Sequence, residues 1–182
     1  MSLAAAPLFL GEDAPGGAPE RGAPPRLSVV AGGRAARGAA TAPSVLLVED
    51  DEAMRFLCTF NLEAAGFRVA GAETGRAGLE RAQVERFDLI LLDVMLPDVG
   101  GFVIAEQLHS QDSTRGVPIV FVSARTSAAD LARGRAVGAI DYVTKPFDPV
   151  ELASRLREDL EELGRGGADR VWELRFGGSS NE

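Results

Sequence analysis

The chain has 182 residues, of which 46% are hydrophobic and 25% are charged, and its formal net charge is −8. This composition is typical of one soluble globular domain with tails, and the acidic charge disfavours non-specific binding to nucleic acid or anionic membranes. Cys58 is the single cysteine, which excludes an internal disulfide and suits a cytoplasmic location. The sequence has no apolar run of the roughly 18 residues that a membrane span needs, and its first residues lack the basic leader of a signal peptide.

Residues 1–43 differ in composition from everything that follows. Ala, Gly and Pro fill 25 of these 43 positions. Such a segment has too few large apolar side chains to offset the entropy lost on ordering, so we expect a disordered N-terminal extension. Within it, Leu27, Val29 and Val30 are candidates for a short strand or a docking peptide. A start codon assigned too far upstream would produce the same composition.

From Ser44 onward, short apolar runs alternate with amphipathic segments. The pattern predicts strands at 45–48, 67–70, 89–92, 119–122 and 140–143. It predicts helices at 51–65, 74–85, 101–110, 127–137 and 149–163. We expect Asp51 to be the N-cap of the first helix and Gly66 to follow its last turn. Alternating strands and helices indicate an α/β fold, an open five-stranded parallel sheet that is doubly wound, flavodoxin-like (βα)5.

The predicted globular domain covers residues 44–163. We expect the glycine-rich run 164–167 to end the last helix, which leaves a short C-terminal tail at 164–182. Trp172, Leu174 and Phe176 alternate with polar residues, which is a strand-like pattern. The favoured interpretation is a partly ordered tail, and packing on the domain or binding to a partner are the alternatives.

Polar side chains stand at the carboxyl ends of four predicted strands. Glu49 and Asp50 follow the first strand, Asp93 the third, Ser123 the fourth and Lys145 the fifth. Ligands of parallel α/β sheets bind outside these ends. Three neighbouring carboxylates repel one another, so we expect a cation among them, and oxygen ligands without His or Cys favour Mg²⁺.

The same residues suit phosphoryl transfer. Mg²⁺ commonly shares a phosphate oxygen, and an aspartate can act as the nucleophile. Lys145 is the only lysine among 19 basic side chains, and it stands where a compact positive charge would meet a phosphoryl oxygen. The Ser123 hydroxyl could donate to a second oxygen.

The segment 45–147 resembles the response-regulator receiver domain of two-component signalling. Asp93 follows Asp50 by 43 residues, and Ser123 and Lys145 follow Asp93 by 30 and 52 residues, which are the usual separations in that family. With the final helix, the resemblance covers about 120 of the 182 residues. The matching stretches are Leu47–Asp51, Asp88–Pro97, Val122–Ala124 and Asp141–Phe147.

The resemblance implies a role for each residue of the metal site. Asp93 would be the phosphoacceptor and would also bind Mg²⁺. Asp50 would be the direct carboxylate ligand, and Glu49 would act mainly through water. The backbone carbonyl of Met95 would be a further protein ligand.

It also implies how the phosphoryl group would be read. Ser123 would bind one of its oxygens, and Lys145 would pair with it. Tyr142 would be the aromatic switch, turning inward when Ser123 moves, and Pro146 commonly follows the lysine through a cis peptide. Gly100 stands where the family often has Asp, which could loosen the loop after Asp93.

The resemblance predicts a phosphorylation-activated signalling switch rather than a classical enzyme, since it would catalyse only its own phosphorylation and dephosphorylation. Its partners would be a histidine kinase or histidine phosphotransfer protein and an unknown downstream protein, with no direct contact to nucleic acid. We expect a single-domain regulator similar to the chemotaxis regulators. A relay intermediate, a phosphate sink and a degenerate receiver that only binds partners stay open as alternatives.

Two functions from other classes fit less well. A haloacid-dehalogenase-type phosphatase needs a second Asp two residues after the nucleophile, and that position is Met95. A flavodoxin-like electron carrier needs a hydroxyl-rich phosphate loop, but the loop here is Glu49-Asp50-Asp51, which would repel phosphate.

The expected output surface comprises the fourth helix, the fifth strand and the fifth helix. In the winged-helix class of response regulators, matching positions form ion pairs across a dimer. Carried over, these would be Arg133 with Glu151 and Asp141 with Arg155, which suggests a homodimer promoted by phosphorylation. Ile140 weakens this interpretation because it replaces a customary charge, and it could instead offer an apolar contact to another partner.

Overall fold

The computed structural model describes residues 42–177. The N-terminal extension up to residue 41, with its candidate strand at 27–30, lies outside the described residues. The strands are β1 (Ser44–Val48), β2 (Arg68–Ala72), β3 (Leu89–Asp93), β4 (Ile119–Ser123) and β5 (Asp141–Thr144). The helices are α1 (Glu52–Ala64), α2 (Gly75–Val84), α3 (Gly101–Ser110), α4 (Ala128–Ala136) and α5 (Pro149–Phe176).

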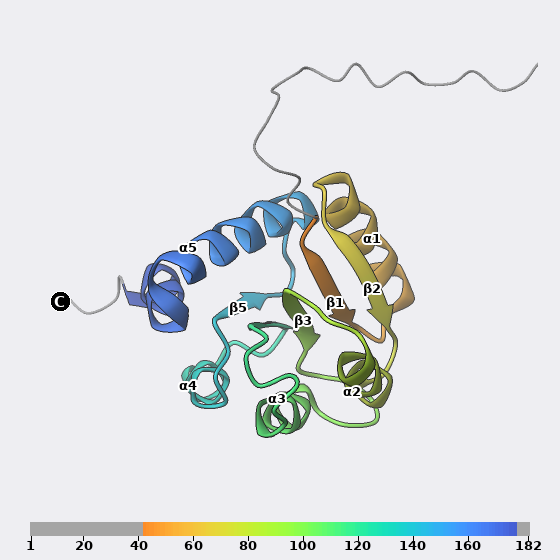
Figure 1. The fold of residues 1–182 in the computed structure, drawn as a ribbon, viewed down its shortest axis with the longest axis horizontal. Helices are drawn as coiled ribbons and strands as arrows, with labels where there is room; N and C mark the ends of the chain where they lie inside the picture. Colours follow the sequence, from red (N-terminus) through yellow and green to blue (C-terminus); the bar gives the residue numbers. More distant parts are fainter. Residues whose placement is uncertain (1–41, 178–182) are drawn as a thin grey trace, which may run out of the picture. The chain divides into compact units, whose positions relative to one another are not determined.

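All five strands are parallel and follow the order β2-β1-β3-β4-β5. Helices α1 and α5 cover one face of the sheet, and α2, α3 and α4 cover the other (Figure 1). The predicted doubly wound α/β fold is therefore confirmed. The chain reverses its direction of winding between β1 and β3, which is where a doubly wound sheet places its ligand site.

The three central strands are buried along their whole length. Alternate residues enter two apolar layers: Leu46 and Phe121 belong to the layer under α2, α3 and α4, whereas Leu47 and Val120 belong to the layer under α1 and α5. This two-sided burial explains why these strands read as uninterrupted apolar runs. Among residues 42–177, no helix is long and apolar enough to cross a membrane.

Helix α1 has the predicted caps and exposes apolar side chains. The Asp51 side chain accepts a hydrogen bond from the Met54 backbone at 2.7 Å, and Gly66 has a φ of 90° after the last turn, as predicted. Leu57 is 43% exposed. Together with Phe56 and Phe60 it forms an apolar patch on the outer side of α1, referred to below as the α1 patch.

The end of α5 corrects the prediction for the C-terminal tail. Helical structure continues past the glycine-rich run to Phe176, interrupted by a kink at Gly167, where φ is 78°. The strand-like interpretation of this segment was wrong, because Val171 and Trp172 are buried whereas Leu174 is exposed. Buried positions three or four residues apart are typical of a helix. A segment this short contains too few of them to be recognised in the sequence, where the alternation of apolar and polar residues is more apparent.

A buried charge cluster joins β5 to both parts of α5. Asp141 and Asp159 are fully buried, and Arg155 donates to Asp141 at 2.5 and 2.7 Å. Arg175, from beyond the kink, donates to Asp159 at 2.8 and 3.0 Å. Burial, followed by the charge of Asp141, raises the pKa of Asp159 to about 7, although the hydrogen bond from Arg175 opposes this shift.

Gly101 allows α3 to begin directly against β3. Its N–H donates to the carbonyl of Val94 at 3.0 Å. A β-carbon at this position would lie 2.2 Å from the carbonyl oxygen of Asp93, so no side chain fits. The neighbouring Gly100, which is the N-cap of α3, has open space, since a β-carbon there would approach nothing closer than 3.8 Å.

We predict that Asp159→Asn weakens the pH dependence of stability. The pKa of Asp159 lies near 7 in the folded state, above its ordinary value of 3.8. Between these two pH values the folded state binds more protons than the unfolded state, so stability falls as pH rises from about 4 to about 7. The free energy of unfolding of the wild type should drop by roughly 1 kcal/mol per pH unit there. Denaturant titrations at pH 5 and pH 8 measure this slope. An unchanged slope in Asp159→Asn would refute the assignment, and Asp169→Asn, at an exposed site, is the control.

We predict that Gly101→Ala lowers the free energy of unfolding by about 1–3 kcal/mol, because the added methyl group must displace the backbone at the end of β3. Gly100→Ala adds the same methyl group one residue earlier, where there is space for it. Denaturant unfolding of both variants provides the comparison. Equal stabilities would show that the close approach at Gly101 is not required.

Candidate functional site

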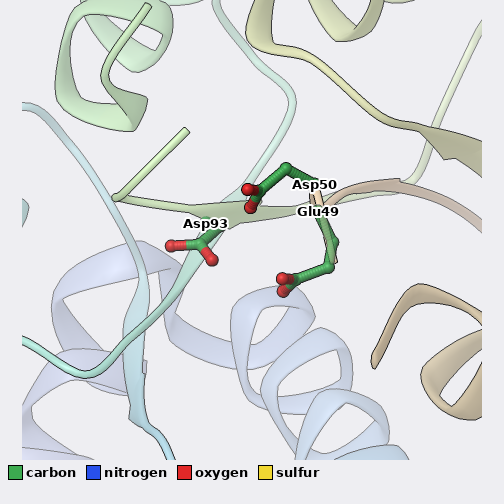
Figure 2. A group of neighbouring side chains, drawn as sticks. All are labelled: Glu49, Asp50 and Asp93. Atoms are coloured by element: carbon green, nitrogen blue, oxygen red, sulfur yellow. The ribbon is translucent and has the colours of Figure 1, made fainter. Parts of the chain in front are cut away.

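Three carboxylates meet at the point where the sheet reverses its winding. Glu49 and Asp50 directly follow β1, and Asp93 is the last residue of β3, the neighbouring strand. Each offers an oxygen that lies within 4.8 Å of the others. Figure 2 shows Asp50 and Glu49 at the end of β1, with the three carboxylates arranged as a triangle.

Lys145 partly neutralises this acidic cluster. Its Nζ atom donates to Oδ2 of Asp93 at 2.5 Å and to the two carboxylate oxygens of Glu49 at 2.7 and 3.0 Å. Glu49 and Asp93 are almost completely buried, whereas Asp50 is exposed. The site therefore has a buried ion-paired side and one carboxylate open to solvent.

The protonation of the site depends on this ion pairing. Burial raises the pKa of Glu49, and the hydrogen bond and charge of Lys145 oppose that shift. Burial alone would lower the pKa of Lys145, but its hydrogen bonds to Asp93 and Glu49 outweigh burial and raise it. Three carboxylates facing one ammonium group leave an excess of negative charge that a hard divalent cation could balance, and the all-oxygen donor set fits Mg²⁺.

The Asp93 carboxylate is held at both oxygens. Oδ2 pairs with Lys145, and Oδ1 accepts a hydrogen bond from the backbone N–H of Met95 at 2.7 Å. The Met95 side chain is 59% exposed beside the site. These contacts fix the orientation of Asp93 and place Met95 in the loop that faces the acidic cluster.

Ser123 and Tyr142 connect the site to α4. Ser123 is fully buried at the end of β4, where its hydroxyl accepts from the Arg125 N–H at 3.1 Å and its carbonyl accepts from the Lys145 N–H at 2.8 Å. The Tyr142 hydroxyl donates to the Arg125 carbonyl at 2.8 Å. Tyr142 is 2% exposed, so its ring is buried in this structure. Gly134 of α4 makes this possible, because a β-carbon there would lie 3.1 Å from the ring.

The peptide between Lys145 and Pro146 is cis, as the resemblance predicted. The loop after Asp93 is anchored at more than one point, despite Gly100 at the start of α3. Asp98 accepts hydrogen bonds from the N–H groups of Gly75 and Arg76 at 2.9 Å, which attaches the loop to the N-terminus of α2. These backbone hydrogen bonds lower the pKa of Asp98, against a contribution from burial.

The residues of the predicted dimer face occupy different environments. Asp141 is buried and bonded to Arg155 of its own chain, so in this structure it is not accessible to a second copy. Arg133 lies over the Phe102 ring at 4.6 Å, and it is 3.9 Å from Glu106. Ile140 is 2% exposed and belongs to the core, so the expectation that it could offer a surface contact was wrong.

Sequence reasoning missed two anchors of the site. Asp98 was not identified because its partners lie more than 20 residues away in the chain. Arg55 donates to the carbonyl oxygens of Glu49 and Asp50 at 2.7 and 3.2 Å, which holds the turn after β1. An arginine in the first turn of a helix gives no sequence signal for such a contact.

Comparison with known proteins places this geometry in a family. The response regulator receiver domain model matches residues 45–157. CseB of Streptomyces coelicolor, a transcriptional regulatory protein, is 41% identical over 128 residues, which are 70% of this chain and 53% of the relative. IrlR of Burkholderia pseudomallei, a transcriptional activator, is 42% identical over 132 residues, with 72% and 55% coverage. The chain thus spans about half the length of the curated relatives it matches.

Solved structures agree with this result. The chemotaxis response regulator CheY4 of Vibrio cholerae superposes with a TM-score of 0.63 at 34% identity, covering 65% of this chain and 99% of that one. A CheY-like receiver domain protein from Methanospirillum hungatei superposes with a TM-score of 0.64 at 30% identity, with 69% and 99% coverage. The chain therefore belongs to the response regulator receiver family of two-component signalling.

Proposed function

We propose that this chain is a phosphorylation-activated switch, which accepts a phosphoryl group onto Asp93 from a histidine kinase or a histidine phosphotransfer protein. The observation that carries the proposal is the environment of the Asp93 carboxylate. It is buried at a strand end, oriented by the Met95 N–H and paired with Lys145, beside two further carboxylates. This arrangement suits a nucleophile whose product is stabilised by a cation and a lysine.

The transfer would conserve the phosphoryl group. The P–N bond of a phosphohistidine would break as a P–O bond to Asp93 forms, and the imidazole would leave with a proton. Lys145, already within 2.5 Å of Asp93, would then pair with a phosphoryl oxygen, and Ser123 would donate to another. Hydrolysis of the acyl phosphate would restore the carboxylate, so the chain would act only on itself.

Mg²⁺ would neutralise charge on the phosphoryl oxygens when bound. Asp50 is the best candidate for a direct ligand because its side chain is exposed and, unlike Glu49 and Asp93, it does not accept a hydrogen bond from Lys145. Both oxygens of Glu49 accept from Lys145, which supports a role through water. We propose Asp93 and the Met95 carbonyl as the remaining protein ligands.

The phosphodonor would be a protein that contacts α1. The α1 patch exposes Phe56 by 71% and Phe60 by 62%, on the helix that begins two residues after Asp50. Exposed apolar groups that lie together are typical of a protein interaction site. A kinase or phosphotransfer helix packed there would bring its phosphohistidine near Asp93.

The output is proposed to pass through protein contacts of the receiver domain, in the cytoplasm. A chemotaxis-like, single-domain role is the first possibility, with a relay intermediate or a phosphate sink as its alternatives, and the structural match to CheY4 is compatible with each of them. The curated relatives are named transcriptional regulators, and the matched segment covers only about half of each, which favours a second possibility, control of DNA binding within a longer protein.

Asp93→Asn should abolish labelling of the chain by phosphoramidate in the presence of Mg²⁺, because the variant lacks the nucleophilic oxygen. Intact mass measured before and after acid or alkali treatment detects the labile phosphoryl group. Asp112→Asn, which removes an exposed carboxylate elsewhere, should be labelled like the wild type. Full labelling of Asp93→Asn would show that the phosphoacceptor is another residue.

Asp50→Asn should weaken Mg²⁺ binding by at least about tenfold, since Mg²⁺ is held by few carboxylates. Isothermal titration of Mg²⁺ into the wild type, Asp50→Asn and the Asp112→Asn control measures the difference. Equal affinities in all three proteins would exclude Asp50 as a ligand.

A further inference from the structure

The segment Ala168–Phe176, which lies beyond the kink of α5, covers the edge of the sheet at β5. Figure 1 shows this last part of α5, in dark blue, turned back beside β5 and α4. We refer to residues 168–176 as the C-terminal clasp. The edge strand β5 is buried at three of its four residues, whereas β2, the opposite edge strand, is mostly exposed or half-buried.

Two adjacent residues of the clasp close both layers of the core. Val171 is fully buried in the apolar layer that contains Ile140 and Leu156, on the α5 side of the sheet. Trp172 is 6% exposed in the layer that contains Tyr142, on the α4 side, and its ring stacks on Phe176 with centroids 4.6 Å apart. The clasp thus covers the same α4–β5–α5 surface from which output was expected.

Arg175 attaches the clasp to two buried carboxylates, Asp141 and Asp159, referred to below as the acidic pair. It donates to Asp159 at 2.8 Å, to Glu158 at 3.1 Å and to the carbonyl of Arg155 at 3.2 Å, and it lies 3.9 Å from Asp141. Without Arg175, Arg155 would be the remaining cation at two buried carboxylates. The buried oxygen Oδ2 of Asp159 already has no hydrogen-bond partner among the described residues. An arginine on the helix that covers this face therefore offsets buried negative charge.

The clasp is attached in a way that permits exchange. A β-carbon on Gly164 or Gly167 would contact nothing within 4 Å, and Gly167 breaks the helix with a φ of 78°. The two sides of the kink are joined by side-chain ion pairs, since Glu162 accepts from both Arg165 and Arg170. Contacts to α4 are made by the exposed Arg135, which lies 5.7 Å from the Trp172 ring and 3.9 Å from Asp169. A groove of about 660 Å³, lined in part by Arg175, Phe176 and Glu151, stays open beside the clasp.

We infer that the chain's own C-terminal clasp occupies the α4–β5–α5 face and blocks the access of a partner to it. Its partner is an amphipathic helix that presents an arginine four residues after a large apolar residue, as Arg175 follows Val171. Such a helix can enter through the open groove and replace the clasp. Phosphorylation loosens the clasp, because Ser123 and Lys145 are joined to α4 and β5; this link rests on the proposed function of Asp93.

Trp172 is the only tryptophan of the chain, so its fluorescence reports the clasp directly. In the 182-residue chain, Arg175→Glu should raise acrylamide quenching of Trp172 several-fold, because a third carboxylate at the acidic pair expels the clasp. Arg115→Glu makes the same charge change at an exposed position outside α4, β5 and α5 and should quench like the wild type. If acrylamide quenches Trp172 no more in Arg175→Glu than in the wild type, the inference is overturned.

Hydrogen exchange on the wild type tests the clasp without relying on a variant that could unfold. Amides of the clasp should exchange at least tenfold faster than amides of the first part of α5, which marks local release. Equal protection in both parts would make the segment an ordinary part of the core and would overturn the inference.

The partner chemistry is tested with a labelled synthetic peptide of residues 165–177. It should bind Arg175→Glu at least tenfold more tightly than the wild type, whose own clasp competes at high effective concentration. A peptide carrying glutamate at the position of Arg175 should not bind. Equal binding of the two peptides would show that the arginine does not recognise this face.

The link to phosphorylation is tested by adding phosphoramidate and Mg²⁺ to the wild type. Trp172 quenching should rise, and Asp93→Asn should show no change. A protein that is phosphorylated by mass but keeps Trp172 protected refutes the release. A protein that is not phosphorylated contradicts the proposed function instead, while the Arg175→Glu and hydrogen-exchange results still decide on the clasp.

Discussion

The mutual repulsion of three carboxylates at one end of the sheet is the constraint on which the site depends. The pairing of β1 with β3 brings Glu49, Asp50 and Asp93 together, so the fold itself creates an electrostatic cost. Lys145 offsets part of it from β5, two strands away from β3. A charged group that arrives at Asp93 must therefore reorganise a contact that spans most of the sheet, and this is how a local event can reach β5.

The path from the site to the surface is short because α4 has a glycine where the Tyr142 ring packs. Gly134 lets that ring lie against Phe121 with centroids 5.9 Å apart, and the Tyr142 hydroxyl reaches the Arg125 carbonyl just after Ser123. A larger residue at 134 would push the ring outward. The position of Tyr142 is thus set jointly by the β4–α4 loop, which senses the site, and by α4, which forms the surface.

The sequence predicted those features whose causes are local or strictly periodic. Asp51 caps α1 through a neighbour three residues away, and buried parallel strands leave apolar runs that need no knowledge of the fold. The site residues were found because parallel strands end at a common edge. The end of α5 was misread because its inward positions make sense only once β5 is known to be an edge strand. Asp98 was missed because its backbone partners are brought close by tertiary structure. Arg55 was missed although its partners are near in the chain, because an arginine in the first turn of a helix does not signal a contact with backbone carbonyls.

The clasp gives the edge strand β5 a second function, because this strand ends the sheet and also forms the surface to which the clasp binds. An uncovered edge strand beside a buried acidic pair would be unfavourable, and the chain covers it with a helix that carries an arginine. The same arginine and apolar side chains then define which other helices can bind there. Coupling between this helix and the site must be reciprocal. If a phosphoryl group on Asp93 weakens the clasp by some factor, a docked clasp weakens the phosphorylated state by the same factor, and a partner helix that removes the clasp restores it. Occupancy of the β5 edge would then set how long Asp93 keeps its phosphoryl group.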